Sequence, residues 1–70
     1  MGINVAVEWE LRILDENGDI ESQFEGLETR GQALVTATRE VEVGQRFQII
    51  AWSDDGSESV ADDSVRKGSA

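Results

Sequence analysis

Apolar and polar residues alternate strictly near the start of the chain. From Val5 to Ile13 the odd-numbered residues are large and apolar, and the residues between them are small or charged. A repeat of two is the period of a β-strand, whose successive side chains point to opposite faces of a sheet. The pattern therefore predicts a strand with one buried face and one polar face.

A turn signal follows this strand in the stretch LDENGDIES. Asn17-Gly18 is the pair preferred in a two-residue type I′ turn, because both positions need positive φ. Such a turn places Leu11 opposite Phe24 and Trp9 opposite Gly26, so that apolar side chains meet on one face. The sequence therefore predicts a β-hairpin.

A helical pattern begins soon after the second strand, which should end near Leu27. Thr29 and Gln32 have the spacing of a capping box, in which side chains bond the free N–H groups at a helix start. Small and apolar residues then recur at intervals of three and four residues. They are Ala33, Leu34, Ala37, Thr38 and Val41. We expect a helix over residues 30–40 that lies close against a sheet.

Two further strands are predicted after the helix. RFQIIAWS, residues 46–53, places Phe47, Ile49 and Ala51 on one face, with Ile50 and Trp52 on the other. The Asp-Gly pair at 55 and 56 is a second hairpin signal. The stretch SESVADDSV that follows is more polar and indicates an edge strand, because charge on an edge discourages unwanted pairing.

These elements predict an α+β fold with the layout ββαββ. Short connections favour a four-stranded antiparallel sheet in the order 2-1-3-4, with the first strand central and the helix on one face. The two hairpins align without a gap, Gly18 on Gly56. We expect a single domain over residues 1–62 and a flexible tail over residues 63–70.

Composition narrows the classes of function. The 70 residues include no cysteine and no histidine, which excludes disulfides, thiolate sites and the common zinc and copper sites. The net charge is −9, from 15 acidic and six basic residues. Such a charge repels nucleic acid and anionic membrane and favours a basic protein partner, or serves only to keep a small protein in solution.

Calcium binding and carboxylate catalysis are two kinds of chemistry that the sequence does not favour. Asp15, Asn17 and Asp19 have the spacing of the first calcium ligands in an EF-hand loop, but Ile20 stands where that loop needs glycine. Glu8 and Glu10 lie about 6.7 Å apart on one strand face. Without histidine, cysteine or tyrosine, and in a chain too short for a deep cleft, they do not indicate an enzyme. We expect no metal and no cofactor.

The sheet face away from the helix is the candidate binding surface. In the predicted register it gathers carboxylates around a small apolar group, which resembles a protein-binding patch. Further acids at the hairpin tip extend its field. The predicted partner-binding residues are Glu8, Glu10, Leu14, Glu21, Glu25, Ile50, Trp52, Asp54 and Asp55.

Trp52 carries most of this hypothesis, because tryptophan is often an energetic hot spot of interfaces. Two other interpretations stay open. Trp52 could be covered by the C-terminal segment or by a second copy of the chain. It could also belong to the core, if the third strand has the opposite register.

The sequence therefore favours a small, non-enzymatic binding module that presents acids to a basic protein surface, such as one that binds nucleic acid. In size and charge the chain resembles the small acidic inhibitors that phages encode, including anti-CRISPR proteins and DNA mimics. No residue motif supports that resemblance. The alternative is a homodimer or larger assembly built through the same face or the edge strand. A small-ligand carrier is a third option. Without a signal peptide or a long apolar run, the expected location is the cytoplasm.

Overall fold

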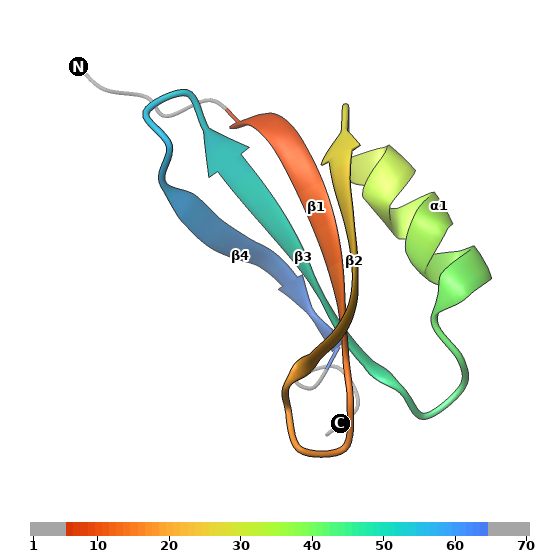
Figure 1. Ribbon diagram of the computed structural model, residues 1–70. Coiled ribbons are helices and arrows are strands. Elements are labelled where there is room, and N and C mark those ends of the chain that lie inside the picture. The colour runs from red at the N-terminus through yellow and green to blue at the C-terminus, as the bar shows by residue number, and fades with distance from the viewer. Residues whose placement is uncertain (1–5, 65–70) are drawn as a thin grey trace.

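The computed structural model describes residues 6–64, which form one four-stranded antiparallel sheet and one helix (Figure 1). Along the chain the elements are β1 (Ala6–Leu14), β2 (Ile20–Leu27), α1 (Arg30–Glu40), β3 (Arg46–Ser53) and β4 (Glu58–Asp63). The strand order in the sheet is β2-β1-β3-β4. The predicted α+β fold, its ββαββ layout and its strand order are confirmed.

The β1–β2 hairpin closes through a three-residue loop. The N–H of Gly18 donates to the carbonyl oxygen of Asp15 over 3.0 Å. The N–H of Asp15 donates to the carbonyl oxygen of Asp19 over 2.8 Å. Only Gly18 in this loop has positive φ, at 86°. This is the hairpin loop in which a left-handed glycine follows a type I turn. The predicted two-residue turn is therefore wrong, because Asn17 does not adopt positive φ.

The β3–β4 hairpin has the same loop geometry. The N–H of Gly56 donates to Ser53 over 3.0 Å, the N–H of Ser53 donates to Ser57 over 2.9 Å, and Gly56 has φ of 88°. Gly56 thus occupies the position that Gly18 occupies in the first hairpin. The gap-free alignment of the two hairpins corresponds to a shared turn type.

The predicted register between β1 and β2 is correct from Leu11 to Ile13 and shifts at both ends of the pair. Next to the loop, Leu14 pairs with Ile20, where the predicted turn requires Glu21. Leu11 pairs with Phe24 as expected, but Trp9 pairs with Leu27. The register shifts between these pairs because Gly26, with φ of 75°, belongs to a bulge that adds one residue to β2.

The helix begins where its capping signals predict. The Oγ1 of Thr29 accepts from the N–H of Gln32 over 3.0 Å, and the side chain of Gln32 accepts from the N–H of Glu28 over 2.7 Å. The first bond satisfies one of the N–H groups that a helix start leaves free, and the second holds the residue before the N-cap against the first turn. The observed range, Arg30–Glu40, confirms the prediction. No helix within residues 6–64 is long and apolar enough to cross a membrane.

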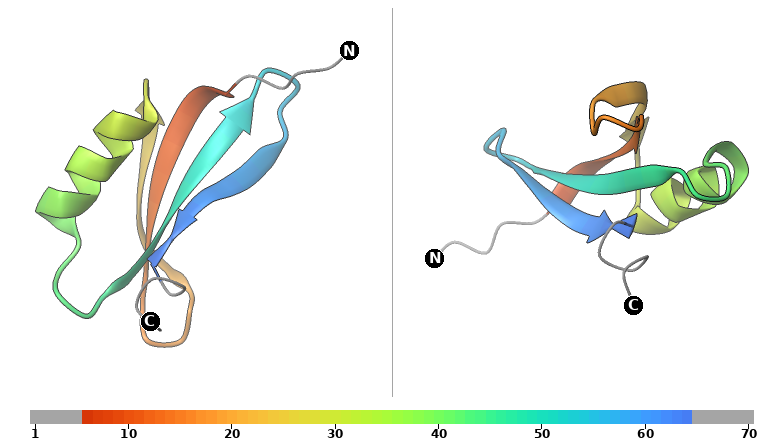
Figure 2. Two further views of the ribbon diagram at one scale, coloured as in Figure 1. Left: turned by 180° about the vertical axis from the view of Figure 1, so that it is seen from behind. Right: turned by 90° about the horizontal axis from the view of Figure 1, so that it is seen from below.

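The core lies between α1 and one face of the sheet (Figure 2). It consists of Leu11, Ile13, Ala33, Ala37 and Ile49. The two alanines let the helix backbone approach the sheet closely. Thr36, also buried, takes a position on the helix that the sequence pattern had given to Thr38, which is exposed.

An ion pair ties the start of the helix to the edge of the sheet. The guanidinium of Arg30 donates to both carboxylate oxygens of Asp62 in β4, over 2.7 and 2.9 Å. Beyond it, β4 runs through Asp63, and the Oγ of Ser64 accepts from the N–H of Phe47 over 2.8 Å. The rest of the predicted tail, residues 65–70, lies outside the described residues.

Candidate functional site

The face of the sheet opposite α1 is organised around one buried carboxylate. Glu10 lies in β1, the central strand that pairs with both β2 and β3, and its side chain points away from the core. No helix within residues 6–64 covers this face (Figure 2). Glu10 nevertheless has only 2% of its surface exposed. Neighbouring side chains must therefore cover it.

Three side chains donate hydrogen bonds to Glu10. The Nε of Arg12 and the Nε2 of Gln23 donate to its Oε2 over 2.8 and 2.9 Å. The Nε1 of Trp52 donates to its Oε1 over 2.9 Å. The donors come from β1, β2 and β3, so one carboxylate links three adjacent strands. A buried carboxylate needs such partners, because an unpaired one would lose its hydration without compensation.

The pKa of Glu10 reflects two opposed effects. Burial alone would raise it, because a charge is disfavoured away from water. The hydrogen bonds from Arg12, Trp52 and Gln23, with the positive charge of Arg12, together hold the pKa of Glu10 below its ordinary value of 4.5. Glu10 is therefore ionised at neutral pH.

Arg12 extends the network to the far edge of the sheet. Its Nη2 and Nη1 donate to the two carboxylate oxygens of Glu58 in β4, over 3.0 and 3.1 Å. Hydrogen bonds to Glu58 and Glu10 raise the pKa of Arg12. Because β3 lies between β1 and β4, this ion pair crosses over β3 on the face where Ile50 points. Ile50 has no exposed surface.

These contacts correct three of the predicted partner-binding residues. Glu10, Ile50 and Leu14 were expected to be exposed to a partner, but their exposed fractions are 2%, 0% and 9%. Glu10 is occupied by its own donors, and Ile50 lies on β3, the strand that the Arg12–Glu58 ion pair crosses. The assignment of Ile50 and Trp52 to the face opposite the core is correct, since neither belongs to the helix-side cluster. The burial of Ile50 was not predicted.

Beside this network lies an open hollow, which we call the Trp52 hollow. Its volume is about 360 Å³. It contains five of the nine predicted residues. The lining residues are Val7, Glu8, Glu10, Glu25, Trp52, Ser53, Asp54 and Gly56. They come from β1, β2, β3 and the β3–β4 loop.

The carboxylates at the rim of the Trp52 hollow differ from that of Glu10. Glu8, Glu25 and Asp54 are exposed, and none forms an ion pair with a basic residue within residues 6–64. Glu8 accepts one hydrogen bond, from the N–H of Gly26 over 3.2 Å, which orients its side chain. Trp52 is partly exposed, and its bond to Glu10 fixes the indole. The hollow thus joins an oriented aromatic ring to three carboxylates that have no counter-charge within residues 6–64.

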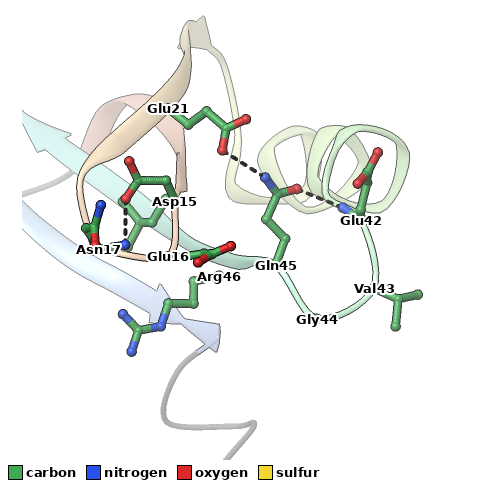
Figure 3. A pocket seen from close by; sticks show the side chains of 10 residues that line it. Asp15, Glu16, Asn17, Glu21, Glu42, Val43, Gly44, Gln45 and Arg46 are labelled. Atoms are coloured by element: carbon green, nitrogen blue, oxygen red, sulfur yellow. Dashed lines mark hydrogen bonds between the residues drawn. The ribbon is translucent and has the colours of Figure 1, made fainter.

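The remaining predicted residues lie elsewhere. Glu21 and Leu14 line a second hollow of about 610 Å³, between the β1–β2 loop and the α1–β3 loop (Figure 3). There Glu21 accepts from the Nε2 of Gln45 over 3.3 Å. Asp55 accepts from the Oγ and N–H of Ser57, over 2.7 and 2.9 Å, and these bonds lower its pKa. These three residues are not part of the Trp52 hollow.

The acidic LDENGDIES loop has a structural explanation. The Oδ1 of Asp15 accepts from the N–H of Asn17 over 2.9 Å (Figure 3). It also accepts from the N–H of Asp19 over 2.9 Å. This is the local bonding by which aspartate stabilises turns. Within residues 6–64, no three acidic side chains are grouped so as to hold a metal ion.

Sequence reasoning missed the roles of Arg12, Gln23 and Glu58. One signal was present, because Arg12 follows Glu10 by two residues and so shares its strand face. The bond from Gln23 also depends on the register, which the hairpin pattern gave correctly at this point. The ion pair between Arg12 and Glu58 crosses β3. It depends on how β4 aligns with β3, which the sequence left open.

Acid should weaken the fold through Glu10. Its pKa is lower folded than unfolded, so its contribution is complete above about pH 4.5 and is lost as pH falls through the lower folded value. As the pH is lowered below 4.5, we expect the urea concentration at the midpoint of unfolding to decrease more for the native chain than for Glu10→Gln. The comparison cancels the loss of repulsion among the other acids. Parallel pH profiles for the two proteins would contradict this role.

Comparison with known proteins does not identify the chain: no protein family model, no curated protein and no solved structure matches it. The function is therefore inferred from the residues on the sheet face opposite α1.

Proposed function

We propose that the protein is a non-enzymatic binding module that docks a basic segment of another protein on the sheet face opposite α1. The observation that carries the proposal is the Trp52 hollow. Its rim acids, Glu8, Glu25 and Asp54, have no basic partner within residues 6–64. Trp52 offers apolar area beside them. Carboxylates around an exposed aromatic side chain are complementary to a lysine- or arginine-bearing surface.

The net charge supports the same direction. At −9 over 70 residues, the chain attracts basic surfaces at a distance and speeds their encounter. Arg12 and Arg30 are already engaged by Glu10, Glu58 and Asp62. Most of the remaining acids therefore act outward.

A finer form of the proposal concerns the partner. A protein surface that normally holds nucleic acid is basic, and the module would block it by occupying it. Small acidic phage inhibitors, including anti-CRISPR proteins and DNA mimics, act in this way. The support here is chemical: the chain has the charge and the exposed acids that such a surface binds. Competition between the chain and DNA for the isolated partner tests this form.

The function is tested by capture from nuclease-treated cell lysate with matched variants. The hollow variant carries Glu8→Gln, Glu25→Gln and Asp54→Asn. The control carries Glu16→Gln, Asp19→Asn and Glu42→Gln, with the same change in charge at the opposite end of the sheet. We expect a basic protein that the native chain and the control retain and the hollow variant loses. Its retention should weaken as salt rises, because salt screens exposed charges.

Two results would contradict the proposal. One is that no captured protein distinguishes the hollow variant from the control. The other is that the distinguishing protein is not basic, or that its binding resists high salt. Circular dichroism on all three proteins checks that each is folded, which is expected because every substituted residue is exposed.

A further inference from the structure

We infer that the Trp52 hollow receives one arginine side chain of the partner and prefers it to lysine. This inference rests on the proposed function and specifies how the basic segment is recognised. The guanidinium would stack on the indole of Trp52 and donate to the carboxylates of Glu8, Glu25 or Asp54. The occupant follows from the charge of the face and from the shape of the hollow.

The chain's own Arg12 shows how a guanidinium is held on this face. It reaches across β3 and joins carboxylates on two different strands, with its Nε 2.8 Å from Glu10 and its Nη2 3.0 Å from Glu58. One planar fork of donors thus satisfies two acids at once. On the other side of Glu10 the hollow repeats half of this arrangement. It has the acids, and no guanidinium from the described part of the chain lines it.

The openness of the hollow and its acidic rim fit a side chain better than an enclosed small-molecule ligand. At about 360 Å³ it holds the space of about a dozen water molecules. Pockets that bury whole ligands begin near this volume and are largely apolar and enclosed. This hollow is open and has three carboxylates on its rim. It suits the end of one long side chain carried by a partner that covers the opening.

Trp52 accounts for the preference between the two basic residues. Its Nε1 is already bonded to Glu10, so the indole cannot donate to a ligand and presents its ring. A guanidinium stacks on an aromatic face and still donates in its own plane to neighbouring acids, whereas an ammonium is a compact, strongly hydrated charge. A cage for methylated lysine needs several aromatic walls, and here Trp52 is the aromatic residue that lines the hollow.

The test uses the full chain labelled with ¹⁵N and three short peptides. The peptides are identical except for one central residue, which is arginine, lysine or citrulline. Citrulline keeps the shape of arginine without its charge. The reporter is the indole N–H signal of Trp52, assigned by its loss in Trp52→Phe, with the signal of Trp9 as internal reference. Peptide dissociation constants come from the shift during titration.

We expect the arginine peptide to move the Trp52 signal and to bind about fivefold more tightly than the lysine peptide, with no shift from citrulline. Glu8→Gln with Asp54→Asn should weaken arginine binding at least about fivefold, and Glu16→Gln with Asp19→Asn should not. Equal affinity for arginine and lysine would overturn the inference while leaving the proposed function standing. So would the absence of any Trp52 shift up to about 10 mM peptide. Loss of hollow-dependent partner capture would instead refute the function itself.

Discussion

Replacing Glu10 by alanine is expected to lower the free energy of unfolding by about 3 kcal/mol. The substitution leaves Trp52 and Gln23 without their acceptor and removes one of the two carboxylates that hold Arg12. Arg12 keeps Glu58, which limits the loss. For a chain of 70 residues the total is on the order of 5 kcal/mol, so more than half of it would disappear. Urea denaturation followed by circular dichroism measures it.

The control for this experiment is Glu25→Ala. Glu25 lines the same hollow but is exposed. Its replacement by alanine removes the same charge as the replacement of Glu10. Its effect should stay within about 0.5 kcal/mol. Equal effects of the two substitutions would mean that Glu10 contributes only charge and that the network on this face is not structural. Glu10→Gln should fall between them, because an amide keeps the size and one acceptor oxygen.

Replacing Ile50 by alanine is expected to cost about 3 kcal/mol of unfolding free energy, as for other fully buried large apolar residues. Ile50 points away from the helix-side core, yet it has no exposed surface. The Arg12–Glu58 ion pair crosses β3 on the face where Ile50 points, and we infer that this polar network shields the apolar side chain. Urea denaturation at neutral pH measures the loss.

Val60→Ala is the matched control for Ile50→Ala. Val60 pairs with Ile50 across β3 and β4 on the same face, but it is 47% exposed. Its replacement should cost less than about 1 kcal/mol. If Ile50→Ala were as mild as Val60→Ala and weakened partner binding instead, Ile50 would be an exposed anchor. The cover over this face would then be absent in solution.

The elements of this fold were predictable because each has a local signal. The alternation in β1, the caps of α1 and the glycines of both loops act over a few residues, and the observed bounds follow them. The failures came from backbone detail. A left-handed Gly18 after a type I turn and a bulge at Gly26 both fit the same letters as the simpler turn and register that were predicted.

The candidate site was only partly predictable, for a different reason. Strand alternation correctly placed Glu8, Glu10 and Trp52 on one face, and they meet at one hollow. Alternation cannot say which of these side chains is covered. That depends on Arg12 reaching Glu58 across two strand boundaries, a contact set by the alignment of β4. Glu10, one of the predicted binding acids, is therefore structural, and its neighbours carry the proposed binding role.

On the face opposite α1, residues 6–64 leave open a hollow that we propose is filled by another molecule. The measurement that tests this proposal most directly is light scattering after size exclusion at low and high salt, with acrylamide quenching of Trp52 in a Trp9→Phe background. We expect a monomer at both salt concentrations, with Trp52 accessible to the quencher. A salt-resistant dimer with Trp52 protected would contradict it, because the face would already be occupied by a second copy.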